Sequence, residues 1–172
     1  PSGKEYKIVA DAANAMGATY IDALFKKIPG NLIKMNFELD GTFPSHQPDP
    51  LQFDTLVDLQ KKVVEEKADL GLAPDGDGDR IFFIDEKGEI VSPSQIIALV
   101  SRELLKGNKG AKILVDLKYI FTPKRSIEEF GGELIVTKTG HAFITEAMHK
   151  NEGLFAGEAS GHYYFGAAGG AE

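Results

Sequence analysis

The chain has 172 residues, of which 42% are hydrophobic, enough for one ordinary domain or two small ones with cores of their own. Its formal net charge of −7 and its lack of a Lys and Arg cluster argue against nucleic acid and anionic membranes as partners. No apolar run approaches a membrane span, no signal peptide is recognisable, and the absence of cysteine fits a cytoplasmic protein.

The first half of the chain alternates short apolar runs with amphipathic stretches, which is typical of strands that alternate with helices. A long loop with Pro44, Pro48 and Pro50 interrupts this alternation. The expected elements are a strand at 7–11, a helix at 18–28, a strand at 32–37, a helix at 53–67, and strands at 69–73 and 81–84.

The second half repeats this plan. Its expected elements are a helix from 93 or 94 to 106, a strand at 112–116, a helix at 123–130, a strand at 134–137, a helix at 142–150 and a strand at 154–156. Both halves begin with similar strands, at Lys7–Asp11 and Lys112–Asp116, and each has a glycine-rich polar loop after its third strand. We interpret this similarity as an internal duplication. The predicted fold class is α/β, with two tandem α/β/α-type domains, residues 1–91 and 92–172, built on mixed, largely parallel sheets.

The acidic loop, residues 75–80, has the sequence Asp-Gly-Asp-Gly-Asp-Arg. The carboxylates of Asp75, Asp77 and Asp79 stand so close together that a folded chain would resist the arrangement unless a cation neutralised it. The glycines between them lack Cβ atoms and let the loop turn tightly. Because all the ligands are hard oxygens, the sequence predicts one Mg²⁺ ion, with Mn²⁺ or Ca²⁺ as alternatives.

Two other interpretations of the acidic loop stay open. An EF-hand would use the same aspartates and Glu86, but Arg80 stands where that loop needs glycine, and the flanking segments are expected to be strands. The second alternative is a solvated acidic turn, since Asp-Gly pairs are common in hairpins. Arg80 is either a two-pronged partner for a phosphate that also bonds the metal or one half of a surface salt bridge.

A second polar loop, residues 157–162, has the sequence Gly-Glu-Ala-Ser-Gly-His. If this stretch is extended, the side chains of Glu158, Ser160 and His162 point the same way and suit the hydroxyl groups of a sugar. A polar turn without a binding role is an equally open interpretation. The GxSxG elbow is absent, and Ser160 and His162 are spaced too closely to predict a catalytic triad.

Three further polar residues follow expected strand ends in the same half of the chain: Lys118, Lys138 and His141. A single lysine or histidine is usually a surface residue. Three of them at strand ends indicate a binding edge, because ligands in open α/β sheets bind at the carboxyl ends of the strands.

These motifs resemble those of the α-D-phosphohexomutases, the family of phosphoglucomutase, phosphomannomutase and phosphoglucosamine mutase. The acidic loop is similar to the family's metal loop, and residues 157–162 are similar to its sugar-binding loop. Family members have four domains, and the resemblance covers the second domain and most of a C-terminally truncated third. Further similar segments are residues 44–50, 116–118 and 138–141.

The resemblance implies a Mg²⁺-dependent mutase that interconverts hexose 1-phosphate and hexose 6-phosphate through a phosphoserine enzyme and a bisphosphorylated sugar. The implied residues are Asp75, Asp77 and Asp79 for the metal, Arg80, Lys118, His141 and His162 for catalysis, and Lys138, Glu158, Ser160 and His162 for the substrate. The implied partners are a hexose phosphate and the domains that carry the phosphoserine and the C-terminal phosphate-binding loop. Without those domains the 172 residues alone are expected to be inactive.

Two other functions stay open. One is a non-catalytic, metal-dependent sugar-phosphate-binding module, although binding alone hardly needs three carboxylates. The other is a Mg²⁺-dependent phosphatase in which a loop aspartate attacks. Ala159 occupies the variable position of the sugar-binding loop and leaves the choice of glucose, mannose or glucosamine open.

Overall fold

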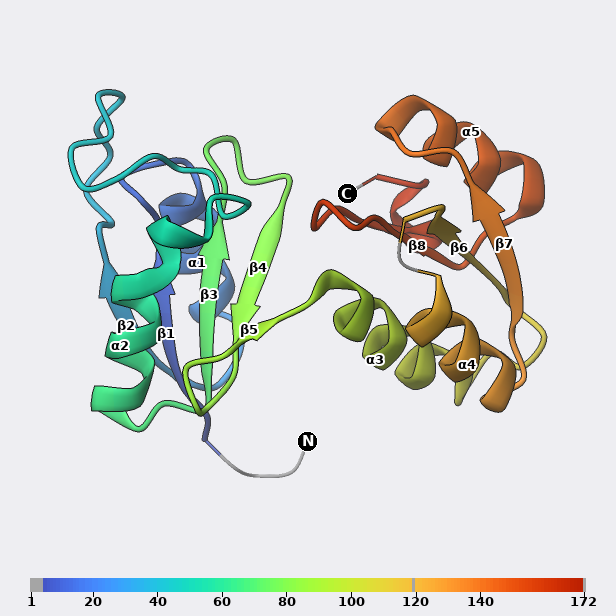
Figure 1. Ribbon diagram of the computed structural model, residues 1–172, viewed down its shortest axis with the longest axis horizontal. Helices are drawn as coiled ribbons and strands as arrows, with labels where there is room; N and C mark the ends of the chain where they lie inside the picture. The colour runs from blue at the N-terminus through green and yellow to red at the C-terminus, as the bar shows by residue number, and fades with distance from the viewer. Residues whose placement is uncertain (1–4, 119, 172) are drawn as a thin grey trace. The chain divides into compact units, whose positions relative to one another are not determined.

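The computed structural model describes residues 5–118 and 120–171, and the packing of the chain divides it into two units, Pro1–Val91 and Ser92–Glu172 (Figure 1). Each unit contains one β-sheet, covered by helices, with hydrophobic core clusters of its own.

The elements of the first unit, in chain order, are β1 (Lys7–Asp11), α1 (Gly17–Phe25), β2 (Asn31–Met35), the 3₁₀ helix η1 (Phe53–Leu56), α2 (Val57–Glu66), β3 (Leu70–Pro74), β4 (Ile81–Ile84) and β5 (Ile90–Val91). The strand order in the sheet is β2-β1-β3-β4-β5. β1 is parallel to β2 and β3, whereas β4 is antiparallel to both of its neighbours.

Helices α1 and α2 cover opposite faces of this sheet, because successive residues of a strand point to opposite sides. On β1, Val9 packs with Leu59 and Val63 of α2, whereas Ala10 packs with Ile21 of α1. Figure 1 shows α2 in front of the sheet and α1 behind it. Because β1 is covered on both faces, its central residues Ile8, Val9 and Ala10 form an unbroken apolar run and do not alternate.

The elements of the second unit are α3 (Pro93–Leu105), β6 (Lys112–Asp116), α4 (Phe121–Glu129), β7 (Glu133–Thr137), α5 (His141–Asn151), β8 (Phe155–Gly157), β9 (Tyr163–Phe165) and the 3₁₀ helix η2 (Gly166–Ala168). The strand order is β7-β6-β8-β9, with β6 parallel to both neighbours and β9 antiparallel to β8. On β6, Ile113 packs with Ile97 of α3 and Ile127 of α4, whereas Leu114 packs with Ile144 of α5.

The second unit begins at a capping box that the sequence encodes in four residues. The side chain of Ser92 accepts a hydrogen bond from the backbone N–H of Gln95 at 3.4 Å, and the Gln95 side chain accepts one from the Ser92 N–H at 3.0 Å. Pro93 occupies the first helical position, where its missing N–H has no partner to lose. These residues define the start of α3 sharply.

Both sheets share one plan, the plan that an internal duplication predicts. The first strand lies between the second and the third and is parallel to both, and the fourth strand is antiparallel to the third. None of the helices in the described residues combines the length and the apolar character needed to cross a membrane.

The ends of some elements differ from the sequence prediction. Helix α1 ends at Phe25 and not at Ile28, and the residues after it form turns. Strand β2 ends at Met35, because Asn36 has a left-handed φ of +55° through which a strand does not continue. The predicted helix at 53–67 begins as η1 and becomes α-helical at Val57.

The close contact between β3 and α2 gives a stability prediction. A Cβ atom added at Gly71 would lie 2.8 Å from Cγ2 of Val63 and 2.9 Å from Cβ of Ile84. We expect Gly71→Ala to lower the free energy of unfolding by about 1–3 kcal/mol, the usual cost of overpacking a core. Urea unfolding followed by circular dichroism measures this. Gly41→Ala, with no heavy atom within 4 Å of the added Cβ, is the control and should change stability by less than about 0.5 kcal/mol. Equal stabilities for the two variants would contradict the prediction.

Candidate functional site

The acidic loop joins β3 to β4 at the carboxyl end of β3. Asp75 is buried, whereas Asp77 and Asp79 are exposed, and each offers a carboxylate oxygen within 4.8 Å of the others. Two like charges about 4 Å apart repel by about 1 kcal/mol in water and by about 4 kcal/mol near a protein surface. A divalent cation among these hard oxygen donors would replace this repulsion with attraction, so the donor set fits Mg²⁺.

The EF-hand interpretation is wrong. An EF-hand loop joins two helices, whereas the acidic loop joins two antiparallel strands. Glu86, the supposed twelfth position of such a loop, lies in the turn between β4 and β5.

Hydrogen bonds within the acidic loop hold it in shape. Oδ1 of Asp75 accepts the backbone N–H groups of Gly78 at 3.0 Å and Arg80 at 3.1 Å. The hydroxyl of Tyr20, on α1, donates to the carbonyl of Asp77 at 2.8 Å. Gly78 has a φ of +86°, and a Cβ atom there would lie 2.2 Å from the ring of Tyr20. This position therefore requires glycine.

The guanidinium of Arg80 lies among three carboxylates. Its Nε donates to Oδ2 of Asp75 at 2.7 Å and lies 3.9 Å from Oδ1 of Asp79, while Nη1 donates to Oδ1 of Asp49 at 3.2 Å. Burial alone would lower the pKa of Arg80, but the hydrogen bond and charge of Asp75, with the charges of the other two, raise it. Arg80 is therefore a permanent cation beside the predicted metal ligands.

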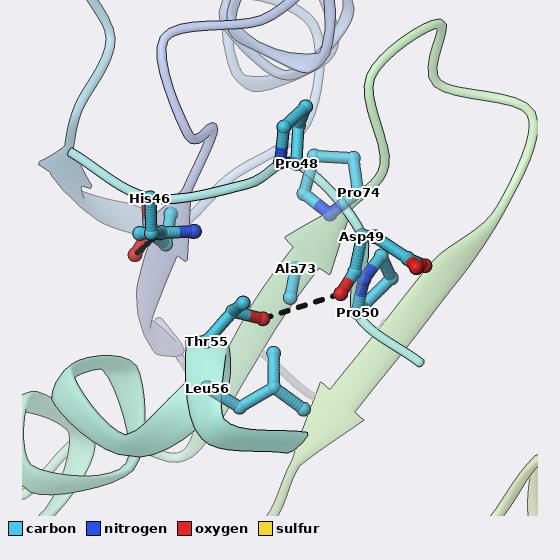
Figure 2. Close-up of a pocket in the computed structure, with 9 residues that line it drawn as sticks. His46, Pro48, Asp49, Pro50, Thr55, Leu56, Ala73 and Pro74 are labelled. Atoms are coloured by element: carbon cyan, nitrogen blue, oxygen red, sulfur yellow. Dashed lines mark hydrogen bonds and ion pairs between the residues drawn. The ribbon is translucent and has the colours of Figure 1, made fainter. Parts of the chain in front are cut away.

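Asp49 belongs to the long loop between β2 and η1, and its carboxylate stays ionised. The side chain of Gln52 donates to it, and this bond, followed by the N–H of Leu51 and the charge of Arg80, lowers the pKa of Asp49 against the opposing effect of burial. Figure 2 shows Asp49 between Pro48 and Pro50, with its carbonyl oxygen directed at Thr55.

His46 connects the same loop to the end of β1. Its Nε2 lies 3.0 Å from Oδ2 of Asp11, which is 3% exposed, and its Nδ1 lies 3.0 Å from the carbonyl oxygen of Gln47. Both ring nitrogens thus face acceptors, and only the doubly protonated ring can donate to both. Burial alone would lower the pKa of His46, but the hydrogen bonds to Gln47 and Asp11 and the charge of Asp11 raise it above the ordinary value of 6.5.

In the second unit, the predicted site residues gather at one edge of the sheet. Strands β6, β7 and β8 are parallel, so the segments that follow them meet at their carboxyl ends. Lys118 follows β6, Lys138 follows β7, and His141 is the first residue of α5. All three are exposed, and Nζ of Lys138 lies 5.4 Å from the ring centre of Phe143.

Glu158 is buried at this edge, with 2% of its surface exposed, and both of its oxygens have donors. Oε1 accepts the backbone N–H of Gly140 at 2.8 Å, and Oε2 accepts the hydroxyl of Tyr164 at 2.7 Å. Burial alone would raise the pKa of Glu158, but the bonds from His162, Tyr164 and Gly140 lower it. Glu158 is therefore a carboxylate that ties the loop after β7 to the loop after β8.

The expectation of an extended stretch at residues 158–162 is wrong. These residues form a tight turn between β8 and β9, closed by the Glu158 N–H on the carbonyl of His162 at 3.0 Å, with Gly161 at a φ of +92°. Within this turn, Nδ1 of His162 lies 2.7 Å from Oγ of Ser160 and 3.3 Å from Oε2 of Glu158. A catalytic triad needs the base to contact its acid and its nucleophile through different nitrogens. This arrangement is not a triad.

Four residues that the sequence prediction did not assign to the site shape its loops: Tyr20, Asp49, Asp116 and Tyr164. Asp116, 1% exposed, accepts the N–H of Ala159 and the hydroxyl of Thr139 through Oδ2, both at 3.3 Å. The Pro-Asp-Pro run could have indicated Asp49, and the aspartate that ends both similar strands, at Asp11 and Asp116, could have indicated Asp116.

Comparison with protein-family models gives one match for each unit. The model described as phosphoglucomutase/phosphomannomutase, alpha/beta/alpha domain II, matches residues 2–88, and the model of domain III matches residues 92–170. The chain belongs to the phosphoglucomutase/phosphomannomutase family.

Individual members of the phosphoglucomutase/phosphomannomutase family align along most of the chain. It is 40% identical over 159 residues to a phosphoglucomutase of Neisseria meningitidis serogroup A, and 40% identical over 162 residues to a phosphomannomutase/phosphoglucomutase of Pseudomonas syringae pv. tomato. These alignments cover 92% and 94% of this chain but only 35% of each relative. The chain thus spans about a third of the length of the curated relatives that it matches.

The fold agrees with that of a solved member of the phosphoglucomutase/phosphomannomutase family from Burkholderia thailandensis, with a TM-score of 0.91 and 35% identity. The match covers 95% of this chain and 36% of that protein.

The contacts of His46 predict a pH-dependent contribution to stability. Because the folded-state pKa is raised, the contribution of the charged ring is complete below the unfolded-state value and is lost as pH rises through the folded-state value. We expect wild type to exceed His46→Gln in stability by more at about pH 5.5 than at about pH 8.5. Urea unfolding at several pH values measures the difference, and proton NMR of the ring gives the pKa. A midpoint at or below 6.5 for His46 would contradict the assignment.

Proposed function

We propose that this chain is the metal-binding and sugar-binding part of a phosphohexomutase, which interconverts hexose 1-phosphate and hexose 6-phosphate through a phosphoserine and a bisphosphorylated sugar. The observation that carries the proposal is the acidic loop, where three carboxylate oxygens lie within 4.8 Å of one another beside Arg80. The names of the relatives, phosphoglucomutase and phosphomannomutase, supply the substrate class. We also propose a cytoplasmic location.

In this proposal, Asp75, Asp77 and Asp79 hold one Mg²⁺ ion. When bound, the ion supplies positive charge that offsets the negative charge of a phosphoryl group during transfer. Arg80 adds a second positive charge at the same edge, and guanidinium N–H groups not bonded to Asp75 or Asp49 are donors for a phosphate oxygen.

The second unit would bind the sugar at the carboxyl edge of its sheet. Ser160 offers a hydroxyl, and Lys118 and Lys138 offer charged donors for hydroxyl or phosphate oxygens. His141 and His162 are proposed as proton-transfer or binding groups near the reacting hydroxyl. Glu158 is proposed to bind sugar hydroxyls. It also holds the backbone of this edge in place through Gly140.

The alternative functions differ in their products. A phosphatase would release inorganic phosphate, and a binding module would leave the sugar phosphate unchanged. Within the described residues, Ser160 and His162 lack a triad geometry, so this pair offers no activated serine nucleophile, and the proposal assigns the phosphorylated serine to another domain.

Removal of a proposed metal ligand tests the metal site directly. We expect Asp77→Asn to weaken Mg²⁺ or Mn²⁺ binding by more than about tenfold, because loss of a ligand should cost at least as much as loss of an outer-shell partner. Titration calorimetry and the electron paramagnetic resonance signal of free Mn²⁺ measure the affinity. Asp54→Asn removes one exposed carboxylate of the same unit outside the loop and should bind as wild type does. Equal affinities for the two variants would refute the proposed ligand set.

Phosphorus NMR with glucose 1-phosphate or mannose 1-phosphate tests the reaction. We expect the protein encoded by the complete reading frame to form the 6-phosphate, and the 172 residues alone to give no detectable turnover. Inorganic phosphate as the product would favour the phosphatase, and an unchanged substrate would favour the binding module. Turnover by the 172 residues alone would overturn the assignment of the nucleophile to another domain.

A further inference from the structure

The guanidinium of Arg80 lies beside Asp75 and Asp79, two of the carboxylates proposed to bind the metal ion. Its Nε is hydrogen-bonded to Asp75 and lies 3.9 Å from Oδ1 of Asp79, a distance beyond hydrogen-bonding range. A small rotation toward Asp79 would turn this approach into a charge-assisted bond. An arginine placed there would occupy a second oxygen of the proposed metal site, in addition to Oδ2 of Asp75, so the position of its guanidinium affects how strongly it competes with a cation.

Asp49 provides a partner for Arg80 outside the metal loop. Its Oδ1 accepts from Nη1 of Arg80 at 3.2 Å. Among the described residues, the acidic group suited to a metal ion contains Asp75, Asp77 and Asp79 and does not include Asp49. The side chains of Asp49 and Arg80 are 33% and 22% exposed, so the pair itself adds little to stability. Its effect is on the orientation of Arg80.

The backbone around Asp49 is held in place from several sides. Pro48 and Pro50 restrict the chain on either side, and the carbonyl of Asp49 accepts the hydroxyl of Thr55 at 3.3 Å (Figure 2). The same carbonyl accepts the N–H of Gln52 at 3.0 Å. In the same loop, His46 binds Asp11 at the end of β1 through a contact of 3.0 Å between Nε2 and Oδ2. A fixed carboxylate loses little entropy when it binds an arginine, which suits it to hold one.

We propose that Asp49 is a positioning residue that draws the guanidinium of Arg80 away from Asp79, so that Arg80 competes less with a divalent cation for this carboxylate. The inference rests on the proposed metal site. It assigns to the long loop between β2 and η1 a role in metal affinity, although the loop supplies no ligand.

The test compares Mn²⁺ and Mg²⁺ affinities of the 172-residue chain in a double-mutant cycle. We expect Asp49→Ala to weaken binding by about tenfold, the lower end of the range for outer-shell residues. If Asp49 acts through Arg80, the same change made in the Arg80→Met background should leave the affinity unchanged. Asp49→Asn keeps an acceptor oxygen and the side-chain volume, so it should weaken binding less than alanine does.

Asp54→Ala is the matched control, because it removes one negative charge from the same unit, and within the described residues the partners of Arg80 are Asp49, Asp75 and Asp79. This variant should bind the metal as wild type does. Circular dichroism spectra and melting curves establish that each variant is folded, and Asp49→Asn carries the test if Asp49→Ala is not.

The outcomes separate this inference from the proposed function. A loss that is as large in the Arg80→Met background would show that Asp49 acts by its own charge or by loop structure, and would overturn the inference alone. Wild-type affinity in both Asp49→Ala and Asp49→Asn would also overturn it and leave the metal site intact. Absence of Mn²⁺ and Mg²⁺ binding by the wild-type chain would overturn both.

Discussion

The repulsion among three neighbouring carboxylates is the constraint on which the first unit depends. Asp75 is buried, and its oxygens accept two backbone N–H groups and the Nε of Arg80. A buried carboxylate without such donors would be strongly disfavoured. The contacts of Tyr20 and of the loop around Asp49 then keep the neighbouring groups of the acidic loop in place. The sheet of this unit presents that loop at the carboxyl end of β3, between β3 and β4.

Both units place buried acids at the same topological positions. Asp11 and Asp116 end the first strand of their sheets, and Asp75 and Glu158 follow the third strand. Each accepts hydrogen bonds from loop segments that follow neighbouring strands or the same strand. The carboxyl edge of a parallel sheet is where these loops converge, so one acid there can organise several of them. The duplicated fold uses this edge for a cluster of carboxylates in one unit and for hydroxyl, imidazole and lysine groups in the other.

The architecture could be predicted from the sequence because the patterns that specify its strands, helices and turns are local or periodic. The apolar runs of β1 and β6, the Ser-Pro-Ser-Gln cap of α3 and the glycines of the acidic loop each express a constraint that acts over a few residues. The halves of the chain share a similar first strand and a glycine-rich polar loop after the third strand, in the same order, and this repetition revealed the duplication. Element ends were less accessible, since Asn36 can adopt a left-handed conformation that its residue type permits but does not require.

The sequence by itself determined the fold class, the acidic loop and the family, because these follow from residue types at short spacings. Only the tertiary structure decided which distant groups meet: Arg80 with Asp49, His46 with Asp11, and Glu158 with Gly140. It also decided that residues 158–162 turn and do not extend, because the pairing of β8 with β9 closes that segment. Hydrogen bonds between residues far apart in the chain depend on which strands become neighbours in a sheet, and the short patterns of single segments do not say which strands those are.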